Sequence, residues 1–247
     1  MGARTMNITL DRTIGSIVAD DYRAAAVLTA HGIDFCCKGG RTVEEVCRTK
    51  GLDPTALSRE IEESLARDTR EGEDLVQWSL GRLVDHIEAV HHRYVEARIP
   101  VLKQFLEKLC QVHGDRHPEL FQIAAEFDGC ASAMAVHMKK EELVLFPFIK
   151  QLEKAAAEGT AAPHPHFGTV NNPVSMMMED HDAEGERFRR IARLSYGYVN
   201  PPDGCTTYST AMAMLKEFEA DLHRHVHLEN NILFPRAVAL EKQLNNA

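Results

Sequence analysis

A phrase of eighteen residues occurs twice in the chain and limits what the chain can fold into. The first copy, HMKKEELVLFPFIKQLEK, begins at His137, and the second, HVHLENNILFPRAVALEK, begins at His225. In each copy a histidine is followed by a glutamate four residues later, then by Leu-Phe-Pro and by Glu-Lys. Such a repeat in two long helices predicts approximate two-fold symmetry, with the shared histidine and glutamate facing a common axis.

Apolar residues recur at helical spacing over most of the C-terminal two thirds of the chain. Turn residues divide this region into four long helical patterns, expected at about 79–112, 118–154, 172–194 and 206–244. No strand pattern of comparable strength is present. The sequence therefore predicts an all-α protein whose C-terminal part is an up-down four-helix bundle.

The N-terminal part is typical of a small helical module. Thr13 is a suitable cap for a first helix, Thr42 and Glu45 form a capping-box pattern, and Asp53-Pro54 suits the start of another helix. A charged stretch containing Gly72 follows. We therefore expect a helical domain at 1–67, a linker at 68–74 and the bundle at 75–247.

Composition excludes several classes of function. Lys and Arg number 28 against 37 Asp and Glu, a net charge of -9, and an acidic protein repels nucleic acid. No apolar run approaches the roughly 18 residues that a membrane-spanning helix needs, and the N-terminus lacks a signal-peptide pattern. The six cysteines show no disulfide-framework spacing. We therefore expect a cytoplasmic protein that binds neither nucleic acid nor membrane.

The repeated histidine and glutamate are candidate metal ligands. Residues four apart lie on the same face of a helix, so His137 with Glu141, and His225 with Glu229, can reach the same ion or pair of ions. Two inward-facing carboxylates would be strongly destabilising without cations between them. The two pairs together predict a metal site on the bundle axis.

The other two helices supply further imidazoles. His181 is the one histidine of the third helix, whereas the first contains His86, His91 and His92, of which apolar periodicity slightly favours His91. Imidazole and carboxylate ligands without a thiolate favour iron or manganese over structural zinc. We therefore expect four histidines and two glutamates around two metal ions, with open coordination positions.

Several blocks of the sequence resemble the Ric family of di-iron proteins for the repair of iron centres. TIGSIVADDYRAAAVLTAHGIDFCCKGG is similar to the family's ScdA-type N-terminal domain, with its vicinal cysteines. DHIEAVHHRYVEARIP, HMKKEELVLFP, MEDHDAEG, CTTY and HVHLENNILFPRA match the remaining blocks in order. The longer loop around His164 and His166 resembles the denitrification-linked NorA and DnrN branch.

The resemblance implies a hemerythrin-like bundle that holds two non-haem iron ions with oxo and carboxylate bridges. It selects His92 on the first helix, eight residues before Pro100, in place of His91. The implied metal ligands are His92, His137, Glu141, His181, His225 and Glu229. The implied function is repair of iron-sulfur clusters damaged by nitrosative or oxidative stress, with the protein as iron donor and damaged iron-sulfur proteins as partners.

Cys36 and Cys37 stand beside Lys38 and two glycines, an environment in which we expect the thiols to be partly ionised. A role in thiol chemistry or iron transfer is the functional interpretation. The alternative is that both pack as small apolar residues.

Other functions remain open on the sequence alone. The main alternative is a protein that binds or buffers nitric oxide at the reduced di-iron site, and dioxygen is a second small ligand for the open positions. Turnover of a substrate is neither indicated nor excluded, and we also include a homodimer among the assemblies to test. His86, His223 and His227 have no assigned role.

Overall fold

The computed structural model describes residues 8–67 and 75–246. These residues form helices joined by turns, without a β-strand among them; one isolated bridge pairs Thr13 with Thr42. The all-α prediction is therefore confirmed. The linker predicted at 68–74 lies outside the described residues.

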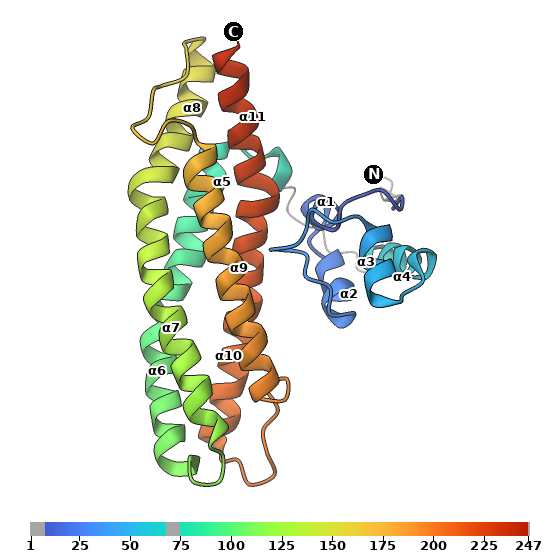
Figure 1. Ribbon diagram of the computed structural model, residues 1–247, viewed down its shortest axis with the longest axis vertical. Coiled ribbons are helices and arrows are strands. Elements are labelled where there is room, and N and C mark those ends of the chain that lie inside the picture. Colours follow the sequence, from blue (N-terminus) through green and yellow to red (C-terminus); the bar gives the residue numbers. More distant parts are fainter. Residues whose placement is uncertain (1–7, 68–74, 247) are drawn as a thin grey trace. The chain divides into compact units, whose positions relative to one another are not determined.

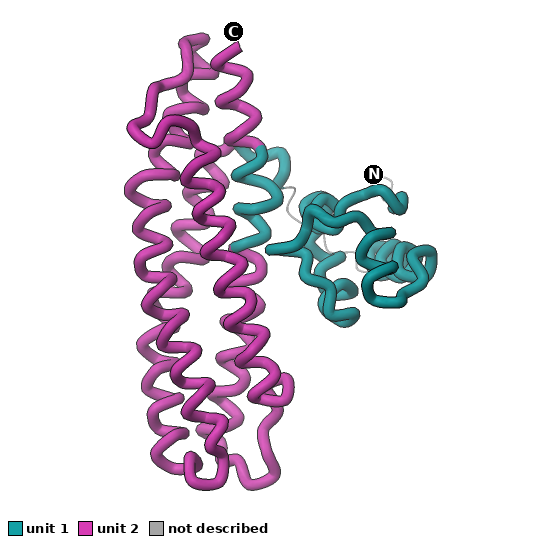
Figure 2. Tube along the Cα trace, viewed as in Figure 1, with its two compact units in different colours: residues 1–79, 226–235 teal, residues 80–225, 236–247 magenta. Residues whose placement is uncertain are grey.

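The chain divides into two compact units, one of residues 1–79 and 226–235 and the other of residues 80–225 and 236–247 (Figure 2). The long helices of the bundle lie side by side in Figure 1. Their bounds along the chain are α5 (Leu80–His86), η2 (Ile87–His92), α6 (Arg93–His113), α7 (Glu119–Lys140), η3 (Glu141–Leu145), α8 (Phe146–Glu158), α9 (Asn171–Leu194), α10 (Thr206–Leu228), η4 (Glu229–Leu233) and α11 (Phe234–Asn245).

These elements correspond to the four predicted long helices, since α5 to α6, α7 to α8, and α10 to α11 each run without a break. Aromatic rings fill the core of the bundle. Phe218 stacks on Phe188 with ring centroids 5.6 Å apart and meets Phe127 edge-on at 5.4 Å, and all three side chains are fully buried. Burial of such side chains is the main stabilising term for helix packing.

The last glutamate of each repeat caps a neighbouring helix. Glu153 accepts hydrogen bonds from the backbone N–H groups of Leu80, at 2.7 Å, and Gly81, at 3.0 Å, where α5 begins. Glu241 accepts from the N–H of Val170 at 2.9 Å and from the Thr169 hydroxyl, just before α9 begins. A carboxylate at a helix N-terminus satisfies free N–H groups and opposes the helix dipole.

The smaller unit contains α1 (Ile14–Asp20), α2 (Ala24–Ala30), α3 (Val43–Lys50), α4 (Pro54–Arg67) and the short η1 (Leu75–Gln77). Thr13 caps α1, and the capping box of Thr42 and Glu45 at the start of α3 is present with both hydrogen bonds. Gly51 ends α3 with a φ of 67°, a left-handed conformation that glycine adopts without strain. These local signals behave as the sequence predicts.

Residues 226–235 of the fourth long helical run belong by their contacts to the smaller unit. The Asn231 side-chain amide donates to the carbonyls of Phe35 and Cys36, each at 3.3 Å. A Cβ atom at Gly15 would lie 2.1 Å from the Asn231 Oδ1 atom, and one at Gly39 would lie 2.6 Å from it. Both glycines are therefore needed for the close approach of Asn231.

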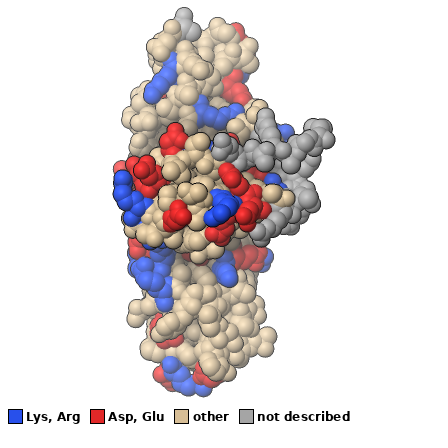
Figure 3. All heavy atoms as spheres, turned by 90° about the vertical axis from the view of Figure 1, so that its right-hand side faces the viewer, with Lys and Arg blue, Asp and Glu red and all other residues tan. Residues whose placement is uncertain are grey.

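On the face shown in Figure 3, acidic and basic side chains are interspersed and form no continuous basic surface among the described residues. This distribution agrees with the acidic net charge of -9 and with the expectation that nucleic acid is not a partner. Among the described residues, no helix combines the length and the apolar character that crossing a membrane requires.

Candidate metal centre

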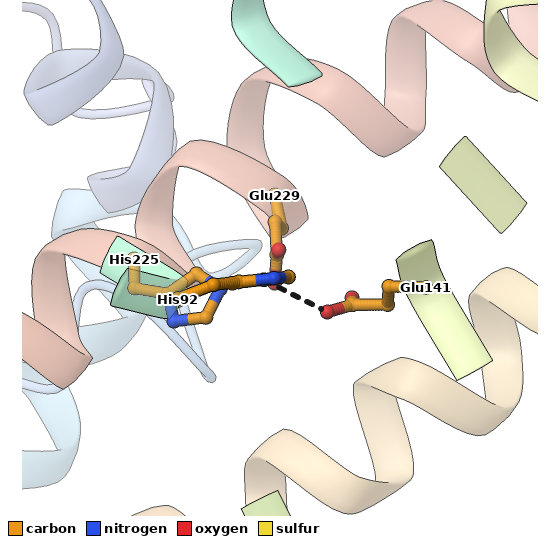
Figure 4. Close-up of side chains that lie close together, drawn as sticks. All are labelled: His92, Glu141, His225 and Glu229. Carbon is orange, nitrogen blue, oxygen red and sulfur yellow. Dashed lines mark ion pairs between the residues drawn. The ribbon is translucent and has the colours of Figure 1, made fainter. Parts of the chain in front are cut away.

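Two groups of imidazole and carboxylate side chains come together around the predicted axis. Within each group the ligand atoms lie within 4.8 Å of one another. The first group is His92, Glu141, His225 and Glu229 (Figure 4), and the second is His137, Glu141, His181 and Glu229. The structure thus brings together all six predicted metal ligands, and the two groups share both glutamates.

Glu141 lies between the two groups. Its Oε2 atom is 3.4 Å from the Nε2 atom of His92 and 3.3 Å from the Nε2 atom of His137. The Nε2 atom of His137 is in turn 3.1 Å from the Nε2 atom of His181. The ring nitrogens therefore converge on one carboxylate oxygen, as they would around a pair of ions that this carboxylate bridges.

The burial of these groups allows a test of whether a pair of cations fits. The side chains of Glu141 and Glu229 are 0% exposed, and the four histidines are at most 3% exposed. Two ionised carboxylates removed from water and placed this close are strongly unfavourable unless positive charge lies beside them. Imidazole and carboxylate donors also suit iron and similar divalent ions. The residues therefore fit two cations.

In two of the imidazoles, a carboxylate lies against the Nδ1 atom, the ring nitrogen other than Nε2. The Nδ1 atom of His92 is 3.0 Å from Glu142 Oε1, and the Nδ1 atom of His137 is 3.3 Å from Asp180 Oδ2. A carboxylate accepting from Nδ1–H leaves the Nε2 lone pair free to bind a metal, and it fixes the direction of the ring. Both rings are thus held in the tautomer that a metal ligand needs.

Two lysines support these outer carboxylates. Partial burial by itself would raise the pKa of Glu142, but hydrogen bonds from Lys139 and His92 lower it overall. Partial burial likewise opposes ionisation of Asp180, whereas hydrogen bonds from Lys140 and His137 lower its pKa. Both outer groups are therefore anionic at neutral pH. Neither group is predicted from the sequence, although each is next in sequence to a predicted ligand.

His91 and His92 are adjacent in sequence but face different groups. His92 belongs to the first ligand group, whereas His91 belongs to neither. The His91 Nδ1 atom is 2.9 Å from Asp221 Oδ1, and its ring stacks on His225 at 5.5 Å between centroids. His86 meets the ring of His91 edge-on at 5.8 Å. His91 is thus buried beside a predicted ligand, which is why apolar periodicity favoured it.

The other two unassigned histidines lie outside both groups. His227 is buried in the smaller unit, where its ring lies 5.7 Å from that of Tyr22 and 5.9 Å from that of Phe35. Its Nδ1 atom is 3.1 Å from the Asn231 amide. His223 is partly exposed on α10. Histidine counts alone could not separate these residues from the ligands.

Each predicted ligand pair adjoins a turn of π-helix. The π-helical segment η3 begins at Glu141, η4 begins at Glu229, and η2 ends at His92. Pro147 and Pro235 follow η3 and η4, and each lacks the N–H that would bond to the carbonyl four residues earlier. Wider helical turns of this kind are rare and occur often at functional sites. Here the repeated Phe-Pro explains why the helix is loosened beside each glutamate.

Comparison with known proteins agrees with this geometry. Residues 83–237 match the family model of the hemerythrin HHE cation binding domain, and residues 10–65 match ScdA_N, described as a domain of unknown function. The iron-sulfur cluster repair protein YtfE of Yersinia pseudotuberculosis serotype O:1b is 31% identical over 229 residues, which cover 92% of this chain and 97% of the relative. YtfE of Yersinia pestis strain Pestoides F has the same identity and coverage.

The chain belongs to the Ric family. The hemerythrin match spans all six residues of the two ligand groups, so the family's cation-binding domain coincides with the site that the geometry defines. The ScdA_N match spans the loop that carries Cys36 and Cys37.

The vicinal cysteines of this Ric protein form a third group of potential metal ligands, together with Asp34. The two sulfur atoms are 3.8 Å apart, and Asp34 Oδ1 accepts from the Cys37 backbone N–H at 3.0 Å and from the Cys36 thiol at 3.4 Å. Asn230 donates to the Cys36 carbonyl at 3.3 Å. Hydrogen bonds to Asp34 within the loop and from Asn230 outside it therefore fix the conformation of the loop.

The expectation that both thiols are partly ionised is wrong for Cys36. Its hydrogen bond to Cys37 and its burial raise its pKa well above the usual range, and the nearby carboxylate of Asp34 raises it further. Lys38, expected from its sequence position to favour the thiolate, is not among the groups that shift this pKa. A cation bound between the sulfur atoms would reverse this balance, because it stabilises the thiolate directly.

Proposed function

We propose that this protein restores iron-sulfur clusters damaged by nitrosative or oxidative stress, and that it does so by donating iron. The observation that carries the proposal is the pair of buried ligand groups sharing Glu141 and Glu229, in a chain 31% identical to iron-sulfur cluster repair proteins over 92% of its length.

In this proposal the bundle holds two non-haem iron ions. His92 and His225 would hold one ion, His137 and His181 would hold the other, and Glu141 and Glu229 would be shared by both. Six side chains on two six-coordinate ions leave positions open for small ligands or for transfer of iron. The residues of the chain set the orientation of the imidazoles and exclude water, since every ligand is buried.

Cys36 and Cys37 are proposed to take part in transfer. Asp34, Cys36 and Cys37 are the other described group whose atoms could hold a metal ion, so this loop can bind iron or present thiolates to a recipient cluster. Because the pKa of Cys36 is raised, binding of a cation there must release a proton. Transfer through this loop should therefore become weaker as the solution becomes more acidic.

The direct test is reactivation of a nitric oxide-damaged iron-sulfur enzyme by iron-loaded protein. We expect full reactivation by the wild type, and loss of reactivation in the double variant Cys36→Ser, Cys37→Ser at unchanged iron content of the bundle. Cys47→Ala is the matched control, because Cys47 is a buried cysteine of the same module outside the ligand group. Full activity in the double variant would exclude the cysteine loop, and failure of the wild type would exclude repair.

Binding of nitric oxide is the second candidate function, favoured by the open positions that four side chains per ion leave. Titration of the reduced, iron-loaded protein with nitric oxide should then give stoichiometric uptake with a visible spectral change. An unchanged spectrum would exclude this function, and dioxygen can be tested in the same way.

We also propose damaged iron-sulfur proteins as the partners and the cytoplasm as the location. Support for the location comes from the six cysteines, all of which are free thiols.

A further inference from the structure

α6 ends and α10 begins at the same end of the bundle (Figure 1). A cysteine and a histidine meet there. His113 is the last residue of α6, and Cys205 immediately precedes the first residue of α10. The His113 Nε2 atom is 3.2 Å from the Cys205 sulfur atom, although 92 residues separate them in sequence. Neither residue belongs to a metal-ligand group described above.

The two residues differ in exposure. The His113 side chain is buried, and the ring of Tyr208 meets it edge-on at 5.5 Å between centroids. Cys205 is exposed. A buried imidazole thus holds a sulfur atom that reagents in solution can reach.

The start of α10 favours the thiolate form of Cys205. The backbone N–H groups of Thr207 and Tyr208, in the first turn of α10, hydrogen-bond to the Cys205 sulfur. A helix N-terminus stabilises an anion. The arrangement therefore favours the thiolate form of Cys205, as in known reactive cysteines.

Cys205 differs in this respect from other cysteines of the chain. The hydrogen bond with His113, followed by those from the backbone, lowers the pKa of Cys205 to about 7. Burial instead raises the pKa of Cys47, Cys110 and Cys130.

The charged and titratable groups around the pair come from α7, from α10 and from the loops that precede these two helices. Arg116 approaches the Nδ1 atom of His113 at 3.5 Å and pairs with Asp203 at 2.9 Å. His117 lies between Asp203 and Glu119, 3.0 Å from each. Tyr208, whose pKa burial raises to about 12, remains protonated at neutral pH.

We propose that Cys205, activated by His113, is a thiol-exchange site that forms mixed disulfides with low-molecular-weight disulfides. The Cys205 thiolate attacks one sulfur of the reagent, a new sulfur–sulfur bond forms, and the sulfur–sulfur bond of the reagent breaks. The electron pair leaves with the second sulfur, which takes a proton from His113 or from water. Cys205 is oxidised and one reagent sulfur is reduced, so no further oxidant is needed.

The test uses the full-length, metal-loaded protein and the neutral probe bis(2-hydroxyethyl) disulfide. Rate constants for modification of Cys205 are measured by peptide mass spectrometry between pH 6 and pH 9, for the wild type and for His113→Gln. A thiol of ordinary pKa has fewer thiolates at low pH, but each thiolate is more nucleophilic. We therefore expect the variant to be about sixfold slower at pH 6, about threefold slower at pH 7 and about threefold faster at pH 9.

The crossing of the two pH profiles distinguishes activation from a structural role. His117→Gln is the matched control, because His117 is a neighbouring histidine bonded to Asp203 and not to the sulfur. We expect its profile to follow that of the wild type. Parallel profiles for the wild type and His113→Gln, or an absence of modification at Cys205 at neutral pH, would overturn the proposal.

A second measurement remains informative if His113→Gln does not fold. The difference in absorbance at 240 nm between the wild type and Cys205→Ser reports the Cys205 thiolate during a pH titration. A midpoint near pH 7 supports the proposal, and a midpoint of about 8.5 or above, the value of an ordinary thiol, overturns it.

Discussion

The two copies of the repeated phrase share a framework and differ in what they place around it. In each copy the glutamate four residues after the histidine begins a π-helical turn, and the final glutamate caps a neighbouring helix. Two of the differences lie directly after the first glutamate. The first copy has Glu142 and Leu143 there, and the second has Asn230 and Asn231.

These two differences have separate consequences. Glu142 bonds to the Nδ1 atom of His92 and so supports a metal ligand. Asn230 and Asn231 instead bond to backbone carbonyls of the loop that carries the vicinal cysteines. Leu143, the counterpart of Asn231, is 73% exposed. The shared positions therefore contribute a histidine and a glutamate from each copy to the two candidate ligand groups, whereas the two positions after the first glutamate contact different parts of the chain.

The largest effect is expected from substitution of the two glutamates that both copies share. Glu141→Gln and Glu229→Gln should each lower metal affinity by more than about 100-fold, because changes to residues behind the ligands already cost 10- to 100-fold. Metal content measured by mass spectrometry checks this. In the metal-free protein the substitutions should raise the free energy of unfolding. Each variant should then be more stable than the wild type, because one buried charge is gone. Full metal retention in either variant would contradict the shared role.

A smaller effect is expected at the positions where the halves differ. Asn231→Leu removes two hydrogen bonds to the cysteine loop and should weaken its local stability by about 2 kcal/mol, or about 30-fold in amide exchange. Hydrogen–deuterium exchange of the peptide spanning 30–42 measures this. The matched control is Leu143→Asn, for which we expect no change in that peptide. Equal effects of the two variants would mean that the halves are not specialised in this way.

The smallest expected effect concerns the capping glutamates. Glu241→Gln should cost about 1–2 kcal/mol, and Glu153→Gln somewhat less because Glu153 is less buried. For a chain of this size each kcal/mol lowers Tm by about 2–4 °C. Thermal unfolding followed by circular dichroism at matched metal content is the measurement. A larger loss for Glu153→Gln would show that burial does not set the order.

Much of the fold could be predicted from the sequence, because local signals decide it. The caps at Thr13 and Thr42, the left-handed Gly51 and the apolar periodicity of the long helices all act within a few residues of one another. The repeated histidine and glutamate likewise predict candidate ligands through their spacing alone. These features need no knowledge of how the helices pack.

Features that depend on packing could not be predicted in this way. His91 and His92 are adjacent, and only the position of Glu141 shows which ring faces the site. Glu142 and Asp180 gain their role from rings on other helices. The pairing of His113 with Cys205 joins residues 92 apart in sequence. The raised pKa of Cys36 follows from burial and from contact between the two thiols, which their sequence neighbours do not reveal.

The central claim is that Glu141 and Glu229 together hold two cations. Anomalous diffraction at the iron absorption edge, from crystals of protein loaded with ferrous iron, tests it most directly. The account predicts two iron peaks, one beside His92 and His225 and the other beside His137 and His181, with both glutamates bound to each. A single peak, or iron found only away from these carboxylates, would contradict it.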